Sequence, residues 1–512
     1  MKRTQAMLFL LPWCTWAADL PTSVCDVMRH GAKADGTTND APAIQKAIDS
    51  CAASGGMVFF PAGNYLSGTI VLKSNITLHL SQGATLWASK KPEDFKPLHL
   101  IYARDAENIT LEGDGTINGN GEAYWDTNTK GFFRAKGPRP SPLVELVNCR
   151  RVRIRDLAFR NAPGWTIHPL GCDGVWIRGI SIVNNTRGPN TDGIDPDSSR
   201  NVFISDLYCE AGDDCIVIKT TGWLAGGKVQ PSENITVTNS VLTTTCGAFK
   251  LGTESLGDFR NIAFTNSTMF RSPGAFQSPI SGIAIDIVDG STLDGLVVSN
   301  IIMRDVRTPI FIRLGNRGRG MQVPVPGILR DVSISNVLAT GAELPSSITG
   351  LPGHSVENLT LANIDITMKV GGGAVRGLDV PENPEKYPDP AMFGPLPAYG
   401  FYVRHAAGLV LRDIQVRWDQ EDLRPAIIFD DVRDLDLDGF RAAKAAGEQP
   451  VVWFNQVTGA LVRGCRAPAG AQRFLRVSGA GTGNVRLWGN DLTGAAQPLD
   501  RAPEVPAAAV VQ

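Results

Sequence analysis

The sequence has little excess charge of either sign. Its 49 lysines and arginines are balanced by 51 aspartates and glutamates, and the formal net charge of the 512 residues is −2. Binding to nucleic acid or to an anionic membrane surface usually requires a basic patch, which this mixed composition does not indicate. We therefore expect neither nucleic acid nor membrane as a partner, and we expect a monomer with a neutral or locally charged ligand.

The first apolar stretch is too short to cross a bilayer. It runs from Ala6 to Trp16, follows two basic residues, and precedes the small residues Ala17 and Ala18, where a signal peptidase could cut. We therefore expect a secreted or periplasmic protein, with residues 1–18 as a signal peptide.

Cysteines are few, and the loss of Cys14 with the signal would leave eight of the nine. An even number in an oxidising compartment permits disulfides. Cys149 and Cys172 are about one repeat apart, and so are Cys215 and Cys246, so each pair could be bonded between neighbouring coils. Free, buried thiols are the alternative.

A short pattern recurs from residue 75 onward: a turn residue, often Asn, and then alternating apolar and polar residues. Most neighbouring copies are 23 to 36 residues apart. Strands with this alternation bury one face, and stacked copies would enclose a continuous apolar interior. The early copies are residues 75–78, 108–111, 151–154, 174–177, 201–204, 234–237 and 261–264. The pattern predicts an all-β solenoid of parallel strands, a single domain over residues 19–500, followed by a flexible tail over residues 501–512.

Two other repeat architectures fit less well. Leucine-rich repeats need Leu at fixed offsets, which are missing here, where Val, Ile and Thr dominate instead. A propeller blade needs about 40 residues.

A short helix is expected before the first strand. Ile44, Ala47, Ile48 and Cys51 have helical spacing, and Asp40 is placed to cap the helix. A helix here would cover the open end of the solenoid, whose unpaired edge would otherwise invite aggregation.

Two insertions interrupt the repeat, at residues 112–149 and 369–400. Long loops on a rigid scaffold often shape a binding cleft. Tyr124 and Trp125 in the first insertion could close one end of such a cleft, which would favour exo action.

The densest polar runs lie in two consecutive coils, Asn190 to Asp197 and Gly212 to Cys215. Asp192 and Asp213 are 21 residues apart, a spacing that stacks them in a solenoid. Three carboxylates would then converge, and like charges held close keep one of them protonated while another stays ionised. The alternative is that these aspartates only cap turns.

Glycoside hydrolysis uses such a pair, an acid for the leaving oxygen and a base for water. A separation of about 6.5 to 9.5 Å would leave room for the water and predict inversion at the anomeric carbon.

The two polar runs resemble the signature motifs of glycoside hydrolase family 28, the polygalacturonases and rhamnogalacturonases. The similarity extends through Trp165 to Pro169 and Met392 to His405, and covers most of residues 25–440. The resemblance implies a right-handed parallel β-helix and an inverting hydrolase that acts on a galacturonic-acid-containing bond of homogalacturonan or rhamnogalacturonan.

By position, Asp213 resembles the general acid of that family. Asp192 and Asp214 resemble the carboxylates that hold and activate the water. The resemblance implies no metal and no cofactor.

The sequence departs from the family pattern in two places. The polygalacturonase Gly-His-Gly motif has no histidine in the matching stretch, Cys246 to Ser255, and members that cleave rhamnogalacturonan resemble this sequence in lacking it. The Arg-Ile-Lys motif, which grips the substrate carboxylate, is expected near Pro309 to Gly315, where only Arg313 remains. A single guanidinium can still hold a uronate.

Further residues are candidates for substrate contacts. For Trp165 the alternative is a core position, and for His168 it is a structural histidine with satisfied hydrogen bonds. The candidate substrate-binding residues are Asn190, Asp195, Trp165, His168, Lys219, Lys250, Glu254 and Arg313.

Two other functions share the expected fold. A polysaccharide lyase would use calcium and a basic residue to remove a proton, and would yield an unsaturated product. A non-catalytic carbohydrate-binding solenoid would bind without turnover.

Overall fold

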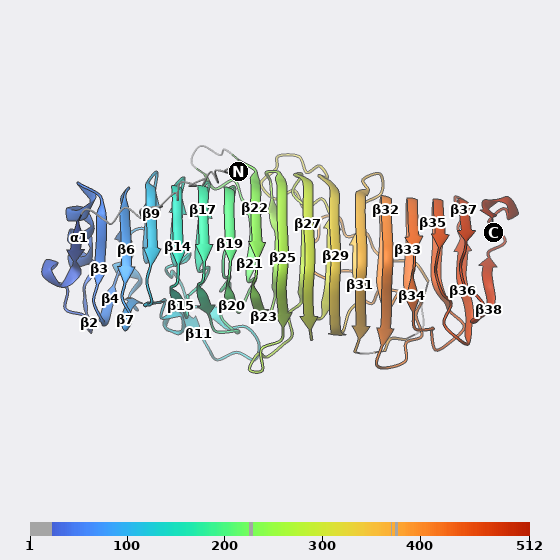
Figure 1. Ribbon diagram of the computed structural model, residues 1–512, viewed down its shortest axis with the longest axis horizontal. Helices are drawn as coiled ribbons and strands as arrows, with labels where there is room; N and C mark the ends of the chain where they lie inside the picture. Colours follow the sequence, from blue (N-terminus) through green and yellow to red (C-terminus); the bar gives the residue numbers. More distant parts are fainter. Residues whose placement is uncertain (1–22, 225–228, 370, 374–376, 512) are drawn as a thin grey trace, which may run out of the picture.

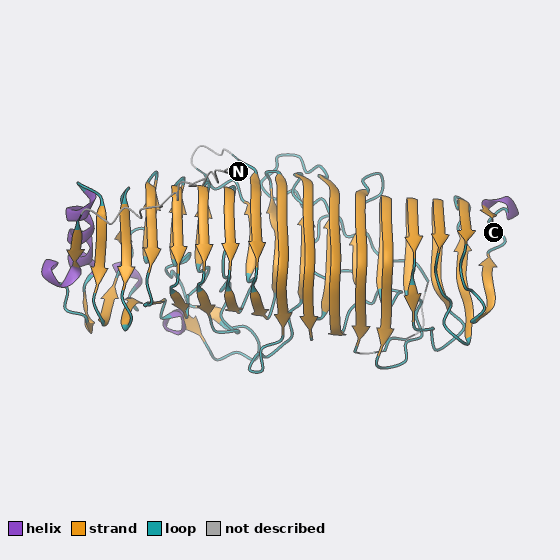
Figure 2. Ribbon diagram, viewed as in Figure 1, coloured by secondary structure: helices purple, strands orange, loops and turns teal. Residues whose placement is uncertain are grey.

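The computed structural model describes residues 23–224, 229–369, 371–373 and 377–511. The expected signal peptide, residues 1–18, lies outside these residues. The described chain winds into one elongated stack of coils, with strands that follow one another along the long axis (Figure 1). Nearly all of its regular structure is β-strand (Figure 2).

Strands pair in parallel with those of the next coil, and the stacked strands fall on three faces along the molecule, called the first, second and third sheets below, which longer strands connect. The first sheet contains β1 (Val24–Asp26), β3 (Gly56–Phe60), β6 (Ile76–Leu80), β9 (Glu107–Glu112), β14 (Arg150–Arg155), β17 (Asp173–Arg178), β19 (Arg200–Ser205), β22 (Ser232–Thr238), β37 (Gly483–Trp488) and β39 (Val510–Val511). The second contains β2 (Asp35–Asn39), β4 (Gly63–Ser67), β7 (Ala84–Ala88), β10 (Thr116–Asn118), β15 (Ala158–Arg160), β18 (Ser181–Val183), β20 (Tyr208–Ala211), β23 (Val241–Thr244) and β34 (Arg441–Ala442).

The third sheet carries most of the candidate site residues. It contains β5 (Ile70–Val71), β8 (Ile101–Arg104), β13 (Val144–Val147), β16 (Ile167–Leu170), β21 (Ile216–Thr220), β24 (Gly247–Ser255), β26 (Ser281–Ile287), β28 (Thr308–Leu314), β30 (Ser346–Thr349), β36 (Ala471–Ser478) and β38 (Ala495–Arg501). Some longer strands turn a corner and take part in more than one sheet: β25 (Phe259–Phe270), β27 (Thr292–Arg304), β29 (Ile328–Ala342), β31 (Val356–Met368), β32 (Phe401–Trp418), β33 (Ile427–Asp438) and β35 (Pro450–Arg463). This is the expected right-handed parallel β-helix.

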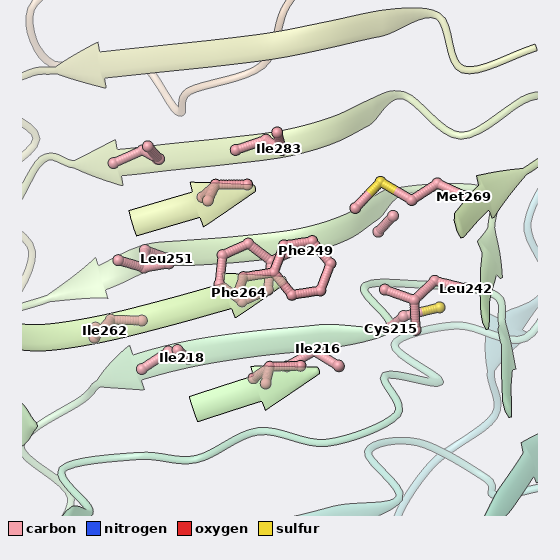
Figure 3. Close-up of a cluster of buried hydrophobic side chains, with 14 of the residues drawn as sticks. Cys215, Ile216, Ile218, Leu242, Phe249, Leu251, Ile262, Phe264, Met269 and Ile283 are labelled. Carbon is pink, nitrogen blue, oxygen red and sulfur yellow. The ribbon is translucent and has the colours of Figure 1, made fainter. Parts of the chain in front are cut away.

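Alternation along each strand decides which side chains fill the interior. On β21, Ile216 and Ile218 point inward, and on β24 Phe249 and Leu251 do so (Figure 3). Phe249 stacks on Phe264 of the next coil with ring centroids 4.2 Å apart. Burying one such side chain contributes about 1.5–3 kcal/mol. The intervening positions, Lys219 and Lys250 among them, are thereby turned toward the outer face.

Asparagines make the turns between strands, as the repeat predicted. Asn234 has a left-handed backbone with φ of 56°, which Asn tolerates better than most residues. Its side chain donates to Asn201 of the preceding coil at 3.2 Å and accepts from Asn261 of the following coil at 3.1 Å. The asparagines therefore form a hydrogen-bonded ladder that fixes the register of the coils.

Helix α1 (Ala41–Ala52) lies at the N-terminal end of the stack, as expected (Figure 1). Asp40 occupies the N-cap position, but its side chain does not cap the helix. Its carboxylate accepts hydrogen bonds from the backbone N–H groups of Lys33 and Ala34, at 2.7 and 3.0 Å. The expected capping bond is therefore wrong, because the preceding loop uses the same oxygens.

Short elements complete the fold. The strands β11 (Trp125–Asp126) and β12 (Arg134–Ala135) pair antiparallel within the first insertion. The 3-10 helices are η1 (Val27–His30), η2 (Pro92–Asp94), η3 (Gly121–Tyr124) and η4 (Ala507–Ala509). Among the described residues, no helix has the length and apolar character needed to cross a bilayer.

The expectation of a flexible tail over residues 501–512 is wrong for its described part. Val510 and Val511 pair with β37. Val505 is fully buried, and Ala502 nearly so. The last residues therefore close the C-terminal end of the core.

One disulfide joins Cys25 to Cys51 and ties α1 to the first strand. The two pairings that the repeat spacing allowed are not formed, since Cys149, Cys172, Cys215 and Cys246 are free thiols. For these four cysteines the alternative interpretation, free thiols, is the correct one.

Candidate active site

The three aspartates lie on neighbouring coils of the third sheet. Asp192 precedes Ile194, which bridges both Ile167 and Ile216. Asp213 and Asp214 come just before β21 on the next coil. One carboxylate oxygen from each of the three lies within 4.8 Å of the others. The side chains converge, as the spacing predicted.

The cluster is tighter than expected. A separation of about 6.5 to 9.5 Å was expected from the usual inverting geometry. One oxygen from each carboxylate lies within 4.8 Å of the others instead, because the pairing of Ile194 with Ile216 sets Asp192 level with Asp214, and Asp213 directly precedes Asp214.

Burial and mutual repulsion disfavour the charged forms in the cluster. Burial, together with the charges of Asp213 and Asp195, raises the pKa of Asp192 well above its usual range. Burial and the charge of Asp214 raise the pKa of Asp213 to about 6. Asp192 is buried, whereas Asp213 is partly exposed and can reach a bound ligand. The cluster therefore holds a proton in mildly acidic solution.

Two donors fix Asp214. The backbone N–H of Gly247 donates to Oδ1 at 2.8 Å, and the ammonium of Lys250 donates to Oδ2 at 3.0 Å. Both oxygens of this carboxylate therefore accept hydrogen bonds, which hold it in one orientation. Asn190 Nδ2 lies 3.4 Å from Asp213 Oδ2, so this predicted binding residue contacts the cluster itself.

Lys219 brings together three of the predicted binding residues. Its ammonium lies 3.3 Å from Glu254 Oε2, 3.7 Å from Asp195 Oδ1, and 4.4 Å from the ring centroid of Trp165. Burial alone would lower the pKa of Lys219, but the charges of Asp195 and Glu254 outweigh it and raise the pKa. Trp165 stacks on Trp223 at 5.5 Å. A cation and two aromatic rings thus lie together on the coil of Asp213 and Asp214 and on the coil that precedes Asp192.

His168 is a buried structural residue. Its Nδ1 lies 2.7 Å from Glu145 Oε2, and its Nε2 lies 3.4 Å from Asp197 Oδ2. Although burial would lower the pKa of His168, the charges of Glu145 and Asp197 raise it to about 10. The ring is 1% exposed, so the structure fits the alternative of a satisfied histidine.

Arg313 does not grip a ligand carboxylate in this structure. The side chain is 1% exposed, and it donates to the backbone oxygens of Gly350 at 3.0 Å and Glu382 at 2.7 Å. Its guanidinium also lies over the ring of Phe393. Arg313 therefore anchors the insertion 369–400, and its assignment as a substrate contact is not supported by its position.

The second insertion forms one wall of a pocket next to the aspartates, as expected for a cleft-shaping loop. The pocket is lined by Asp213, Asp214, Lys250, Asp286 and Tyr387, among others.

By contrast, Tyr124 and Trp125 of the first insertion are buried. The indole N–H of Trp125 donates to the backbone oxygen of Pro163 at 2.9 Å. The rings of Tyr124 and Trp125 therefore do not form the expected end wall of the cleft.

Asp286 lines the pocket but was not among the site residues predicted from the sequence. It is 2% exposed, and its Oδ1 has no hydrogen-bond partner. Burial, with a contribution from the charge of Asp214, raises the pKa of Asp286 to about 8. A single Asp within the apolar run Ser281–Ile287 gave no signal, because the pocket exists only when the insertion folds over β26.

The chain is similar to known proteins in sequence and in fold. The sequence model of glycosyl hydrolases family 28 matches residues 53–379. A probable polygalacturonase of Vitis vinifera is 26% identical over 66% of this chain and 72% of its own length. Polygalacturonase-2 of Solanum lycopersicum is 29% identical over 56% of this chain and 62% of its own length.

Two solved structures share the fold. The exopolygalacturonase of Thermotoga maritima superposes with a TM-score of 0.58 at 24% identity, over 68% of this chain and 88% of that one. The family 28 exopolygalacturonase of Yersinia enterocolitica has a TM-score of 0.58 at 20% identity, over 86% of this chain and 78% of that one.

Proposed function

The chain belongs to glycosyl hydrolase family 28, and from this premise we propose that it hydrolyses a galacturonic-acid-containing, pectin-type glycosidic bond. The observation that carries the proposal is the convergence of three carboxylates within 4.8 Å. Hydrolysis of an acetal needs one group that gives a proton and another that takes one, and this cluster supplies both.

Asp213 is the general acid. It is the partly exposed member of the cluster, and its pKa is raised to about 6 by burial and by Asp214. In the reaction, its proton passes to the leaving oxygen as the bond between that oxygen and the anomeric carbon breaks. The carboxylate left behind is stabilised by the ammonium of Lys250, whose charge favours the ionised form.

Asp192 and Asp214 bind the attacking water. Oδ1 of Asp192 is buried without a hydrogen-bond partner, so it has a free acceptor for a water proton. Asp214 is held by Lys250 and Gly247. The water oxygen attacks the anomeric carbon on the face opposite the leaving group, and its proton passes to one of these two carboxylates. The configuration is therefore inverted.

In this scheme the water binds beside Asp192 and Asp214, on the side away from the leaving oxygen. No metal or cofactor enters this reaction scheme.

Substrate contacts are proposed for the residues around Lys219. The ring of Trp165 can pack on a sugar ring, and Lys219, Glu254 and Asp195 offer donors and acceptors beside it. Asn190, next to Asp213, is placed to contact the sugar whose bond is cleaved.

We propose that the protein acts as a secreted or periplasmic monomer on a pectic polysaccharide or its fragments, without a nucleic acid or membrane partner. Neither the lyase nor the non-catalytic alternative is favoured by the family match.

Product analysis tests the proposal. The purified protein is incubated with homogalacturonan, rhamnogalacturonan and their oligosaccharides, and fragments are separated by chromatography and measured by mass and ultraviolet absorbance. We expect saturated fragments from the wild type and none from Asp213→Asn, which should still bind. Unsaturated fragments would indicate a lyase, and binding without any release would indicate a carbohydrate-binding protein.

A further inference from the structure

We propose that the first sheet carries a second, non-catalytic site on its outer face, which binds the uronate chain of an anionic polysaccharide. The site is a groove of about 250 Å³ lined by Arg153, Arg155, Trp176, Arg178 and Phe203, among others. We call it the arginine groove. The proposal rests on the proposed function only for the kind of polymer, and binding there can be measured without turnover.

The arginine groove crosses three neighbouring coils. Its lining comes from β14, β17 and β19, which lie side by side in the first sheet (Figure 1). The aspartate cluster lies at the third sheet, and only residues 171–172 separate β16 of that sheet from β17. The groove is therefore on an adjoining face of the same stretch of the β-helix, where it can hold a polymer close to the aspartates.

Two aromatic rings form one side of the groove. Trp176 and Phe203 occupy paired positions of β17 and β19 and stack with ring centroids 5.7 Å apart. They are 38% and 43% exposed, although both are large and apolar. The guanidinium of Arg153 lies 5.3 Å from the centroid of the indole ring. The next coil has the small Thr236 beside Phe203, so a sugar ring can pack on the far face of the phenyl ring.

The charge of the groove favours an anion. Among the described residues that line it, three are arginines and none is acidic. Arg155 donates from Nε to Oε2 of Glu112 at 2.9 Å. No ion pair within the described part of the chain involves Arg153 or Arg178. Two guanidinium groups are thus available for a ligand, a local excess that the net charge of −2 does not reveal.

Arg155 and Arg178 are direct neighbours in the sheet. They occupy paired positions of β14 and β17. Like charges at directly opposed positions destabilise a sheet, so folding gives no reason for Arg178 at this place. A carboxylate bound beside the two guanidinium groups offsets their repulsion, and guanidinium groups match carboxylates in shape as well as charge.

The spacing of rings and charges fits a uronate residue. Trp176 and Arg178 are two residues apart on β17, so their side chains leave the same face of the strand about 7 Å from each other. A uronate carries a C–H face and a carboxylate on one ring and can meet both at once. A neutral sugar lacks the charge, and a simple anion lacks the face.

Affinity electrophoresis measures the binding. Asp213→Asn, which should leave the polymer intact, is run in native gels that contain homogalacturonan, carboxyl-reduced homogalacturonan or DNA. We expect homogalacturonan to retard it most. Adding Trp176→Ala and Arg178→Gln should raise the Kd for homogalacturonan by about tenfold. Equal retardation with and without these two substitutions would overturn the proposal. Retardation by the reduced polymer or by DNA as strong as by homogalacturonan would overturn it too.

A control with matched chemistry exists on the same sheet. Arg486 and Trp488 are also two residues apart and exposed on β37, near the C-terminal end. Arg486→Gln with Trp488→Ala, in the same Asp213→Asn protein, should leave the Kd unchanged. A Kd raised as much as by the groove substitutions would contradict a site at the groove.

A single substitution separates binding from folding. Arg178→Gln removes one of two opposed charges, so its melting temperature should equal or exceed that of its parent, while the Kd for homogalacturonan should rise by about threefold. A lower melting temperature with an unchanged Kd would show that Arg178 serves the fold and not a ligand.

The kinetics show whether the groove assists catalysis. With the aspartates intact, Trp176→Ala and Arg178→Gln together should lower the ratio of kcat/KM between the polymer and a galacturonate trisaccharide by about three- to tenfold, through KM. An unchanged ratio would overturn the role of the groove in holding substrate. If the wild type cleaved neither substrate, the proposed function would fail, and the gels would still decide whether the groove binds the polymer.

Discussion

The ammonium of Lys250 lies 3.0 Å from Oδ2 of Asp214, so a lysine one coil further along the helix fixes a carboxylate of the aspartate cluster. The family's histidine is missing from the same coil, whose stretch from Cys246 to Ser255 contains none. Lys250 is thus the cationic residue of this coil that contacts the cluster. It also lowers the pKa of Asp213 through its charge.

Replacing this lysine should alter both rate and pH dependence. In Lys250→Gln the amide can still donate to Asp214, but the positive charge is gone. We expect kcat to fall by about 10- to 100-fold. Because the lysine lowers the pKa of Asp213, its loss should move the alkaline limb of the kcat/KM profile to higher pH. Steady-state kinetics across the pH range measure both, and Lys73→Gln, an exposed lysine near α1, should change neither.

The pH dependence of the wild-type kcat/KM follows from the protonation of Asp213. Asp213 must be protonated to act, and its pKa is raised to about 6. We therefore expect kcat/KM to decrease as the pH rises above about 6. A kcat/KM that stayed constant from about pH 5 to about pH 8 would argue against Asp213 as the acid.

Asp286 should make the folded protein less stable as the pH rises. Its pKa is raised from 3.8 to about 8 in the fold, so between these values the unfolded chain binds fewer protons than the folded one, and stability falls with rising pH. Asp286→Asn removes this effect. We expect its melting temperature to exceed that of the wild type by a margin that widens from about pH 5 to about pH 8, with a gain of about 2 kcal/mol or more at the upper end. A constant margin, measured by circular dichroism, would mean that Asp286 does not titrate as described.

The asparagine ladder stabilises the fold in two ways that can be measured separately: through its side-chain hydrogen bonds and through the tolerance of Asn for a left-handed backbone. Asn300 has φ of 59°, donates to Asn266 at 2.8 Å and accepts from Asn336 at 2.9 Å. Asn300→Ala loses both bonds and adds left-handed strain, for a cost of about 2–3 kcal/mol. Asn300→Gly loses only the bonds and should cost about half as much. Thermal or denaturant unfolding measures both, and equal losses would show that the backbone conformation contributes nothing.

The fold was predictable because each coil repeats the same physical constraints. Asn at a left-handed turn and alternating side chains recur at Asn201, Asn234 and Asn261, and each copy alone indicates a strand. The convergence of Asp192 and Asp213 followed from the same regularity. Coil length varies, however, so spacing could not tell which coil lies beside the site, and Arg313 was placed in the cleft although it is buried behind the insertion.

The rest of the site depends on contacts between distant segments. Asp286 becomes a buried, unpartnered carboxyl only because Tyr387 and its neighbours fold over β26. Likewise, the Cys25–Cys51 disulfide depends on how α1 packs against the first strand. The repeat spacing, which suggested other pairs, says nothing about that packing.

The stereochemistry of the first product tests the account most directly. Proton NMR follows the anomeric signal of the newly formed reducing end before mutarotation mixes the anomers. If Asp213 is the acid and Asp192 and Asp214 hold the water, the product of an α-linked substrate appears first as the β-anomer, and Asp213→Asn gives no signal. A product that appears first as the α-anomer would contradict the account, because it would require a covalent intermediate on one of these aspartates.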